Sequence, residues 1–113
     1  MKQNLYTFMF LLIATISYAG ETVRQYDNQH NITGYTVIEG SRETYFDRDW
    51  NRTGYSKNDV RYNNQHNRTG KTTWNGDTGS EFDKNENRIG HIKRQEGKET
   101  LYDKNWGRRG YKK

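Results

Sequence analysis

The chain has 113 residues, of which 29% are hydrophobic and 14% aromatic, and it contains no cysteine and no proline. The absence of cysteine excludes a disulfide framework, a lipoprotein signal and a thiol nucleophile. The 19 Lys and Arg against 14 Asp and Glu give a formal net charge of +5. The two signs are interspersed, which is not the pattern of a nucleic-acid-binding protein.

The first 19 residues differ in composition from the rest. They contain Lys2 near the start, an apolar run over residues 5–16 and small residues leading to Ala19. These are the three parts of a secretory signal peptide, with cleavage expected after Ala19. Because a membrane span needs about 20 apolar residues, an uncleaved anchor is the less favoured alternative. We therefore expect a bacterial periplasmic or secreted protein, with one domain over residues 20–113 and no stable membrane span after cleavage.

Beyond the signal, one short unit occurs five times in a polar sequence. It consists of an aromatic residue, Asp or Asn, three variable residues, Asn or Gly, two further residues and Gly. The copies are YDNQHNITGY from Tyr26, FDRDWNRTGY from Phe46, YNNQHNRTGK from Tyr62, FDKNENRIGH from Phe82 and YDKNWGRRGY from Tyr102. The leading aromatic residues are 20, 16, 20 and 20 positions apart. This spacing predicts a series of small, similar structural units.

Each unit predicts the tip of a β-hairpin. Asn and Gly take positive φ more readily than other residues, so their exchange predicts a left-handed backbone at that position. The positions are Asn31, Asn51, Asn67, Asn87 and Gly107. The Asp or Asn four residues earlier is expected to start the turn by accepting bonds from nearby N–H groups. The last Gly of each unit then lies in the second strand, where it predicts a bulge or the close approach of a neighbouring backbone or ring.

The links between units predict a second set of turns. Asn75-Gly76 is a favoured dipeptide of the type I′ hairpin turn, and Gly40 and Gly97 occur at similar places in their links. The shorter second link is expected to turn around Lys57-Asn58. No segment after the signal has the apolar periodicity of a helix.

These elements predict an all-β domain of five antiparallel β-hairpin repeats, each of about 20 residues. In one arrangement the hairpins close radially around a pseudo-fivefold axis, with the repeated aromatic residues filling the middle. In the other they stack as an open solenoid. Closure is favoured because it leaves no strand edge unprotected and because no capping unit is evident.

Over residues 26–111 the five copies resemble the repeats of small secreted bacterial proteins described as five-fold β-flowers. That resemblance implies short hairpins radiating from an axis, and no established activity. The copies are more loosely similar to YD-repeat shells and to choline-binding and glucan-binding repeats. In the choline-binding pattern YFD…NG…TGW, Tyr35 or Tyr55 takes the place of the final Trp and the paired tryptophans are absent, so choline recognition is not implied.

No catalytic constellation is present in the sequence. Ser is rare after the signal, and the carboxylates Asp27, Asp47, Asp83 and Asp103 recur in four of the five copies, as expected of residues that start a turn. The histidines are His30, His66 and His91, and they lack the close spacing of metal ligands. We therefore expect a non-enzymatic protein without a metal or a cofactor.

Two rows of the repeat carry side chains suited to binding. One row includes Trp50 and Trp106, whose planar faces suit sugar rings if the side chains are exposed. The other row consists of Ile32, Arg52, Arg68, Arg88 and Arg108, and we expect its four guanidiniums to form a basic ring suited to phosphate, carboxylate or anionic glycan. As alternatives, each Trp folds onto its own hairpin, and each Arg stacks on a neighbouring Tyr or pairs with the Asp of its own hairpin.

The expected function is an exported binding module for a glycan or another anionic envelope component. The expected ligand-binding residues are Trp50, Trp106, Arg52, Arg68, Arg88 and Arg108. An alternative of a different class is a protein-interaction factor, such as an inhibitor, an immunity protein or an adhesion factor, that acts through its rim or its strand edges. An enzyme is the third and least favoured alternative.

Overall fold

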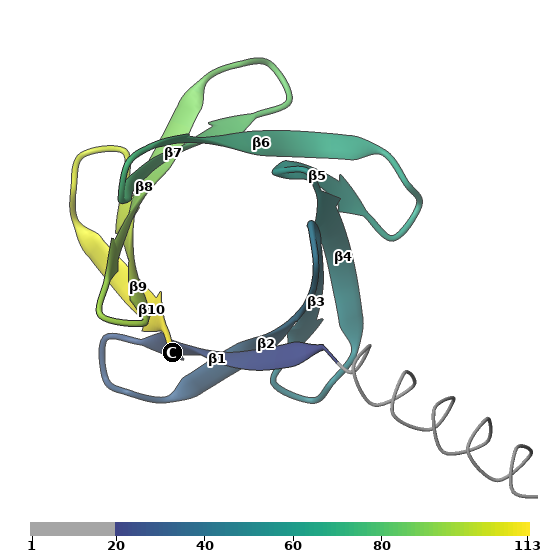
Figure 1. Ribbon diagram of the computed structural model, residues 1–113, viewed down its shortest axis with the longest axis horizontal. Helices are drawn as coiled ribbons and strands as arrows, with labels where there is room; N and C mark the ends of the chain where they lie inside the picture. Colours follow the sequence, from purple (N-terminus) through teal and green to yellow (C-terminus); the bar gives the residue numbers. More distant parts are fainter. Residues whose placement is uncertain (1–19) are drawn as a thin grey trace, which may run out of the picture.

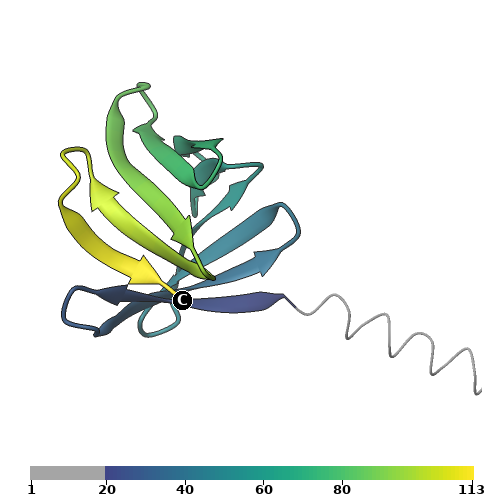
Figure 2. The same ribbon diagram turned by 60° about the vertical axis from the view of Figure 1, so that its left-hand side comes forward.

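The computed structural model describes residues 20–113, and every regular element in this range is a β-strand. The strands are β1 (Glu21–Asp27), β2 (Ile32–Glu39), β3 (Arg42–Asp47), β4 (Arg52–Lys57), β5 (Val60–Asn63), β6 (Arg68–Asn75), β7 (Thr78–Asp83), β8 (Arg88–Gln95), β9 (Lys98–Asp103) and β10 (Arg108–Lys112). Each strand pairs antiparallel with the next, and β1 pairs with β10, so the sheet is a closed barrel. Figure 1 shows the ring of strands from one end, and Figure 2 shows its wall obliquely.

The predicted all-β fold and its closure are therefore confirmed, and the open solenoid is wrong. The predicted signal peptide, residues 1–19, lies outside the described part of the chain. Within residues 20–113, no helix is long and apolar enough to cross a membrane.

The two ends of the chain close the barrel. Tyr26 of β1 pairs with Tyr111 of β10, and their rings stack with centroids 4.8 Å apart. Next to this pair, Arg24 and Lys113 exchange two backbone hydrogen bonds, with N···O distances of 3.1 and 2.8 Å. Every strand consequently has two hydrogen-bonded neighbours, and the described sheet has no unpaired edge.

Residues 48–51 connect β3 to β4. Three of them, residues 48–50, form a loop closed by Asp47 and Asn51, and its geometry explains the repeated unit. The Asp47 N–H donates to the carbonyl of Asn51 at 2.9 Å, and the Trp50 N–H donates to the carbonyl of Asp47 at 3.1 Å. Trp50 has a φ of 64°. This is a type I turn followed by a left-handed residue, the usual form of a three-residue hairpin loop. The loops after β1, β5, β7 and β9 have the same pair of backbone hydrogen bonds.

The left-handed residue lies one position earlier than predicted. The positive φ angles belong to His30, Trp50, His66, Glu86 and Trp106. At the following position, where Asn and Gly exchange, φ is not positive, and the backbone N–H contacts the residue that starts the turn. The Asn51 N–H donates to Oδ1 of Asp47 at 2.9 Å, and the Gly107 N–H donates to Oδ1 of Asp103 at 2.7 Å.

The Asp or Asn that precedes each loop starts the turn, as predicted. Oδ1 of Asp47 accepts a second hydrogen bond from the Asp49 N–H at 2.9 Å. The corresponding bond is present in the other four loops. Hydrogen bonds, first of all from the backbone N–H four residues later, hold the pKa of Asp27, Asp47 and Asp83 below its ordinary value.

These lowered pKa values predict that the barrel loses stability as the pH falls below about 4. The carboxylates stabilise the fold fully above their unfolded pKa, and this contribution is lost as the pH falls through the lower, folded pKa. Urea unfolding between pH 7 and pH 3 measures the effect. The control replaces Asp27, Asp47 and Asp83 with Asn, which already occupies this position as Asn63, and it should remove most of the pH dependence. A wild-type barrel equally stable at pH 7 and pH 3 would contradict the proposed role of these carboxylates.

Two-residue loops connect the strands at the other end of the barrel. They consist of residues 40–41, 58–59, 76–77 and 96–97. The predicted turns at Asn75-Gly76 and Lys57-Asn58 are each one residue too early. Asn75 pairs with Thr78 as the last residue of β6, so Gly76, with a φ of 62°, takes the first loop position.

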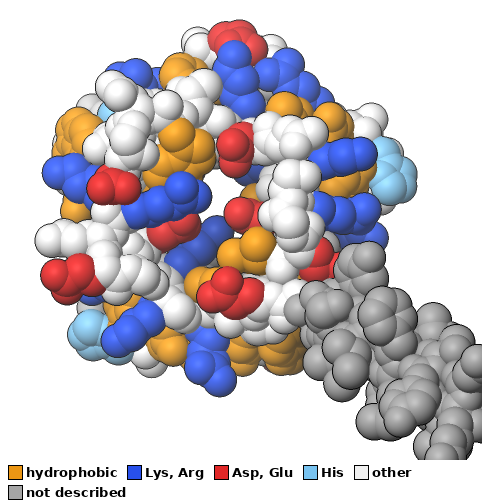
Figure 3. Space-filling model, viewed as in Figure 1, with side chains coloured by type: hydrophobic (Ala, Val, Ile, Leu, Met, Phe, Trp, Pro, Cys, Tyr) orange, Lys and Arg blue, Asp and Glu red, His pale blue; other side chains and the backbone are white. Residues whose placement is uncertain are grey.

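The repeated aromatic residues lie on the outside of the barrel, so the prediction that they fill its middle is wrong. Successive side chains of a strand point to opposite faces. Tyr45 and Ser56 line the lumen, which directs their neighbours Phe46 and Tyr55 outward. Figure 3 shows hydrophobic side chains distributed around the outer wall. The small apolar core is inside, where Ile92 and Leu101 are the buried hydrophobic residues of the described chain.

The last Gly of each unit allows neighbouring strands to approach closely, as predicted. A Cβ atom on Gly54 would lie 2.5 Å from the carbonyl oxygen of Tyr62, and one on Gly34 would lie 2.5 Å from that of Phe46. In each of the five cases, the obstructing carbonyl belongs to the leading aromatic residue of another copy. The space between adjacent hairpins therefore requires Gly.

Candidate functional site

The two predicted tryptophans lie on the outer wall, where each contacts a neighbouring hairpin. Trp50 stacks on Tyr35 of β2, with ring centroids 4.0 Å apart and planes 11° apart. It also packs at a tilt against Phe46 of its own hairpin, at 5.4 Å. Trp106 stacks in the same way on His91 of β8, at 3.8 Å. Trp50 is 50% exposed and Trp106 is 47% exposed, so each indole combines a packing role with an accessible surface.

The same contact occurs at all five loop tips with different chemistry. The left-handed residue of each tip meets the residue that follows the repeat Gly of the neighbouring hairpin. The pairs are Trp50–Tyr35, His66–Tyr55, Glu86–Lys71, Trp106–His91 and His30–Tyr111. Aromatic stacks, histidine–hydroxyl bonds of 2.8 Å and an ion pair of 2.6 Å thus fill equivalent places. One copy has Lys71 and Glu86 where the other copies have Tyr, His or Trp at the two equivalent positions. This paired departure was a sequence signal of the contact, and it was missed because each position of the repeat was considered separately.

This pairing predicts that the ion pair of β6 can be exchanged for an aromatic stack. The double variant Lys71→Tyr with Glu86→Trp recreates the pair formed by Tyr35 and Trp50. The effects of the two single variants on the free energy of unfolding are added to give the value expected without coupling. The double variant should be about 0.5–1.5 kcal/mol more stable than this value, because each single variant leaves one partner unmatched. Urea denaturation of the wild type, both single variants and the double variant measures this coupling energy. Additive effects would show that the paired residues do not act together.

The predicted arginine row is exposed on the outer wall but is already in contact with other side chains. Three of its guanidinium carbons lie over aromatic rings: Arg52 over Tyr55 at 5.1 Å, Arg88 over Phe82 at 5.6 Å and Arg108 over Tyr111 at 5.5 Å. The fourth, Arg68, pairs with Glu86 at 3.2 Å. Among the described residues, none of these arginines forms a salt bridge with the Asp of its own hairpin. The stacking alternative therefore describes most of the row.

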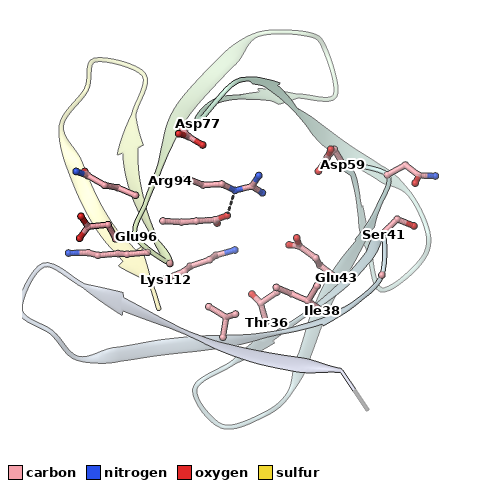
Figure 4. Close-up of a pocket in the computed structure, with 16 residues that line it drawn as sticks. Thr36, Ile38, Ser41, Glu43, Asp59, Asp77, Arg94, Glu96 and Lys112 are labelled. Carbon is pink, nitrogen blue, oxygen red and sulfur yellow. Dashed lines mark hydrogen bonds and ion pairs between the residues drawn. The ribbon is translucent and has the colours of Figure 1, made fainter. Parts of the chain in front are cut away.

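The barrel encloses a cavity that was not predicted from the sequence. The cavity has a volume of about 880 Å³, and residues of the two-residue loops line its mouth. Figure 4 shows side chains from several strands and loops directed into it. A smaller space of about 210 Å³ continues deeper into the lumen. The two spaces share Glu43, Asp59, Arg94, Glu99 and Lys112 in their walls.

The wall of the larger cavity is acidic although the chain is basic. Its charged residues are Glu43, Asp59, Asp77, Glu96, Glu99, Arg94, Lys98 and Lys112, which is five acids against three bases and a net charge of −2. Removing the single Lys of residues 1–19 from the total of +5 leaves +4 for residues 20–113. The charge outside this wall is therefore +4 minus −2, or +6. The deeper space adds Glu81, Arg61 and Arg109, so the two spaces together have a net charge of −1 and the rest of residues 20–113 has +5.

Side chains inside the lumen form two groups, one stacked and ion-paired and one hydrogen-bonded. The Arg94 guanidinium carbon lies 3.6 Å from the ring centroid of Trp74, and Arg94 Nε donates to Oε2 of Glu99 at 2.8 Å. The Tyr45 hydroxyl donates to Oε1 of Glu43 at 3.4 Å. Burial raises the pKa of Tyr45 to about 12, so its hydroxyl keeps its proton at neutral pH.

Residues that point into the lumen vary from copy to copy. The position before the leading aromatic residue is Gln25, Tyr45, Arg61, Glu81 and Leu101 in the five copies. A purely structural position would be expected to keep one residue type, as the Gly position does. This variation is the sequence signal from which the lumen could have been identified as a candidate site.

Within residues 20–113, no group of three or more His, Asp or Glu side chains is arranged to hold a metal ion. Comparisons of the chain with family models, with curated proteins and with solved structures find no match. Function is therefore inferred from the geometry of this chain alone.

Proposed function

We propose that this chain is a non-enzymatic, exported binding module that acts in the bacterial envelope or outside the cell. Its fold is proposed to be a five-hairpin repeat around a pseudo-fivefold axis, of the β-flower kind. The near-constant spacing of the sequence units supports this architecture, as do the shared hydrogen bonds of the five three-residue loops. The composition of residues 1–19 supports export.

The proposed ligand is an anionic glycan or another anionic envelope polymer, bound on the outer wall. The observation that carries this proposal is the charge separation, which leaves +5 outside the two spaces of the lumen. A polymer that follows the outer wall meets exposed guanidiniums on four hairpins, namely those of Arg52, Arg68, Arg88 and Arg108. Guanidiniums bind carboxylate and sulfate groups through paired N–H donors. The half-exposed indoles of Trp50 and Trp106 supply planar surfaces for sugar rings.

Titration calorimetry with dextran sulfate, and with neutral dextran of the same length, tests this function. The informative variant is Trp50→His, because a His–Tyr pair already occupies the equivalent place at His66 and Tyr55, so the fold should be retained. Loss of the indole at one of the two sites should weaken dextran sulfate binding about tenfold, which corresponds to about 1.4 kcal/mol. Binding should also weaken as salt is added.

The matched control is Ile89→Ala, which removes another exposed hydrophobic side chain of the described surface, 45% exposed, and should leave binding unchanged. Equal binding of neutral dextran would contradict the role of charge. Unchanged binding by Trp50→His would contradict the role of the indole.

The protein-interaction alternative has less support. Adding a strand from a partner requires an unpaired sheet edge. The described sheet is closed, and each strand already has two neighbours.

A further inference from the structure

The wall of the larger cavity carries charge of the opposite sign to the outer wall, so this cavity suits a different ligand. We propose that the cavity binds a small linear polyamine, an aliphatic chain with two or more protonated amines. The cavity of about 880 Å³ is within the usual size range of small-molecule sites, which is about 300–1,000 Å³. Its net wall charge of −2 matches a ligand with at least two positive charges.

Four carboxylates of the wall have no salt-bridge partner within residues 20–113. Glu96 is directed away from the cavity in Figure 4, and the other three are Glu43, Asp59 and Asp77. Figure 4 shows them on different sides of the cavity, directed into it. Asp59 and Asp77 are exposed at the mouth, and Glu43 is half-buried further inside. Amines spaced along a chain can reach separate carboxylates in this arrangement, whereas one compact cation cannot.

Thr36 provides an independent indication of a ligand. It is only 3% exposed and lines the cavity, and Figure 4 shows its side chain directed toward the centre. Its hydroxyl has no side-chain hydrogen bond with another described residue. No fully buried side-chain oxygen or nitrogen in the described chain lacks a partner, so this hydroxyl is accessible from the lumen. It is placed to accept a hydrogen bond from an amine that has passed the carboxylates.

The remaining wall favours an aliphatic amine over a metal ion or an anion. The carboxylates do not gather into a metal-binding group within residues 20–113. Val23 and Ile38 offer apolar contact for methylene groups. Of the bases directed into the cavity in Figure 4, Arg94 is already held by Glu99 and Trp74, and Lys112 lies over the ring of Tyr45 at 5.3 Å.

Titration calorimetry of the protein with spermidine at low salt tests the proposal. The triple variant Glu43→Gln, Asp59→Asn, Asp77→Asn should bind spermidine about tenfold more weakly, because three partly exposed charge contacts are lost together. Thr36→Val keeps the side-chain shape and should weaken binding a few-fold through loss of one hydrogen bond. The control Asp49→Asn, at an outer loop tip, should bind normally.

Two further measurements decide the interpretation. Spermidine should shift the amide NMR signals of Thr36 and Glu43 in the wild type and leave those of the outer tips unchanged. Dextran sulfate binding should be retained by the triple variant, which separates this site from the outer wall. The proposal is overturned if spermidine does not bind at millimolar concentration, if the triple variant binds it as well as the wild type does, or if Mg²⁺ at the same concentration displaces it completely.

Discussion

Replacement of Gly110 with Ala is expected to destabilise the barrel by about 3 kcal/mol. Gly110 lies in β10, and a Cβ atom there would collide with the carbonyl oxygen of Tyr26 in β1. That carbonyl belongs to backbone that pairs across the closing seam, so it cannot move aside as the end of a flexible side chain can. Relief of the collision requires the seam between β1 and β10 to separate. Urea denaturation measures the loss.

The matched control is Gly107→Asn in the adjacent loop. A Cβ atom on Gly107 meets only the carboxylate of Asp103, and the other four loops contain Asn at this position. This variant should be neutral or slightly stabilising, because Asn restores the side-chain bond that Asn51 makes with Asp47. If Gly110→Ala were as stable as Gly107→Asn, close packing at the seam would not be required.

Replacement of Leu101 with Ala is expected to cost about 3 kcal/mol. Leu101 is 5% exposed and pairs with Ile92, which is 8% exposed. These are the buried hydrophobic residues of the described chain, so few neighbours can move to fill the space left by the leucine. A domain of this size has a total stability of about 5–14 kcal/mol, so the variant should lose a large part of it.

Ile89→Ala serves as the control for this change, because Ile89 is 45% exposed and its truncation should alter stability by about 0.5 kcal/mol or less. Thermal and urea unfolding of both variants give the comparison. Similar, small losses for the two variants would mean that the lumen contains no stabilising apolar core and that the outer aromatic pairs maintain the fold without it.

The architecture was largely predictable because the repeated residues perform local backbone tasks. Asp47 accepts bonds from N–H groups only two and four residues away, so its role can be inferred from spacing. Gly54 indicates a close approach because no other residue fits that space. The position of the left-handed residue was missed because Trp50 is an unusual choice for positive φ. Its stacking on Tyr35 of the preceding hairpin accounts for its use there.

The direction of the aromatic residues was not predictable from their number. A strand alternates between two faces, and Tyr45-Phe46 or Leu101-Tyr102 offer an apolar side chain to either face. The usual placement of aromatic residues in a core failed because this lumen is largely polar. The contacts of Tyr26 with Tyr111, and of Trp50 with Tyr35, join hairpins that local sequence patterns do not connect.

The candidate site was located only in part. Trp50 is half-exposed and Arg52 is exposed, but their packing on Tyr35 and Tyr55 depends on the arrangement of hairpins around the barrel. The lumen was missed because the predicted sites were drawn from residues that recur between copies. Its wall consists of residues that differ between copies, such as Val23 and Glu43 at equivalent positions.

The closed barrel is the basis of every functional proposal made for this chain, since closure creates both the outer wall and the lumen. The most direct test is a NOESY measurement of contacts between β1 and β10. Closure predicts cross-strand signals between the backbone protons of residues 25–27 and 110–112, and signals between the rings of Tyr26 and Tyr111, whose centroids are 4.8 Å apart. Absence of these signals, together with rapid amide exchange in both β1 and β10, would contradict closure.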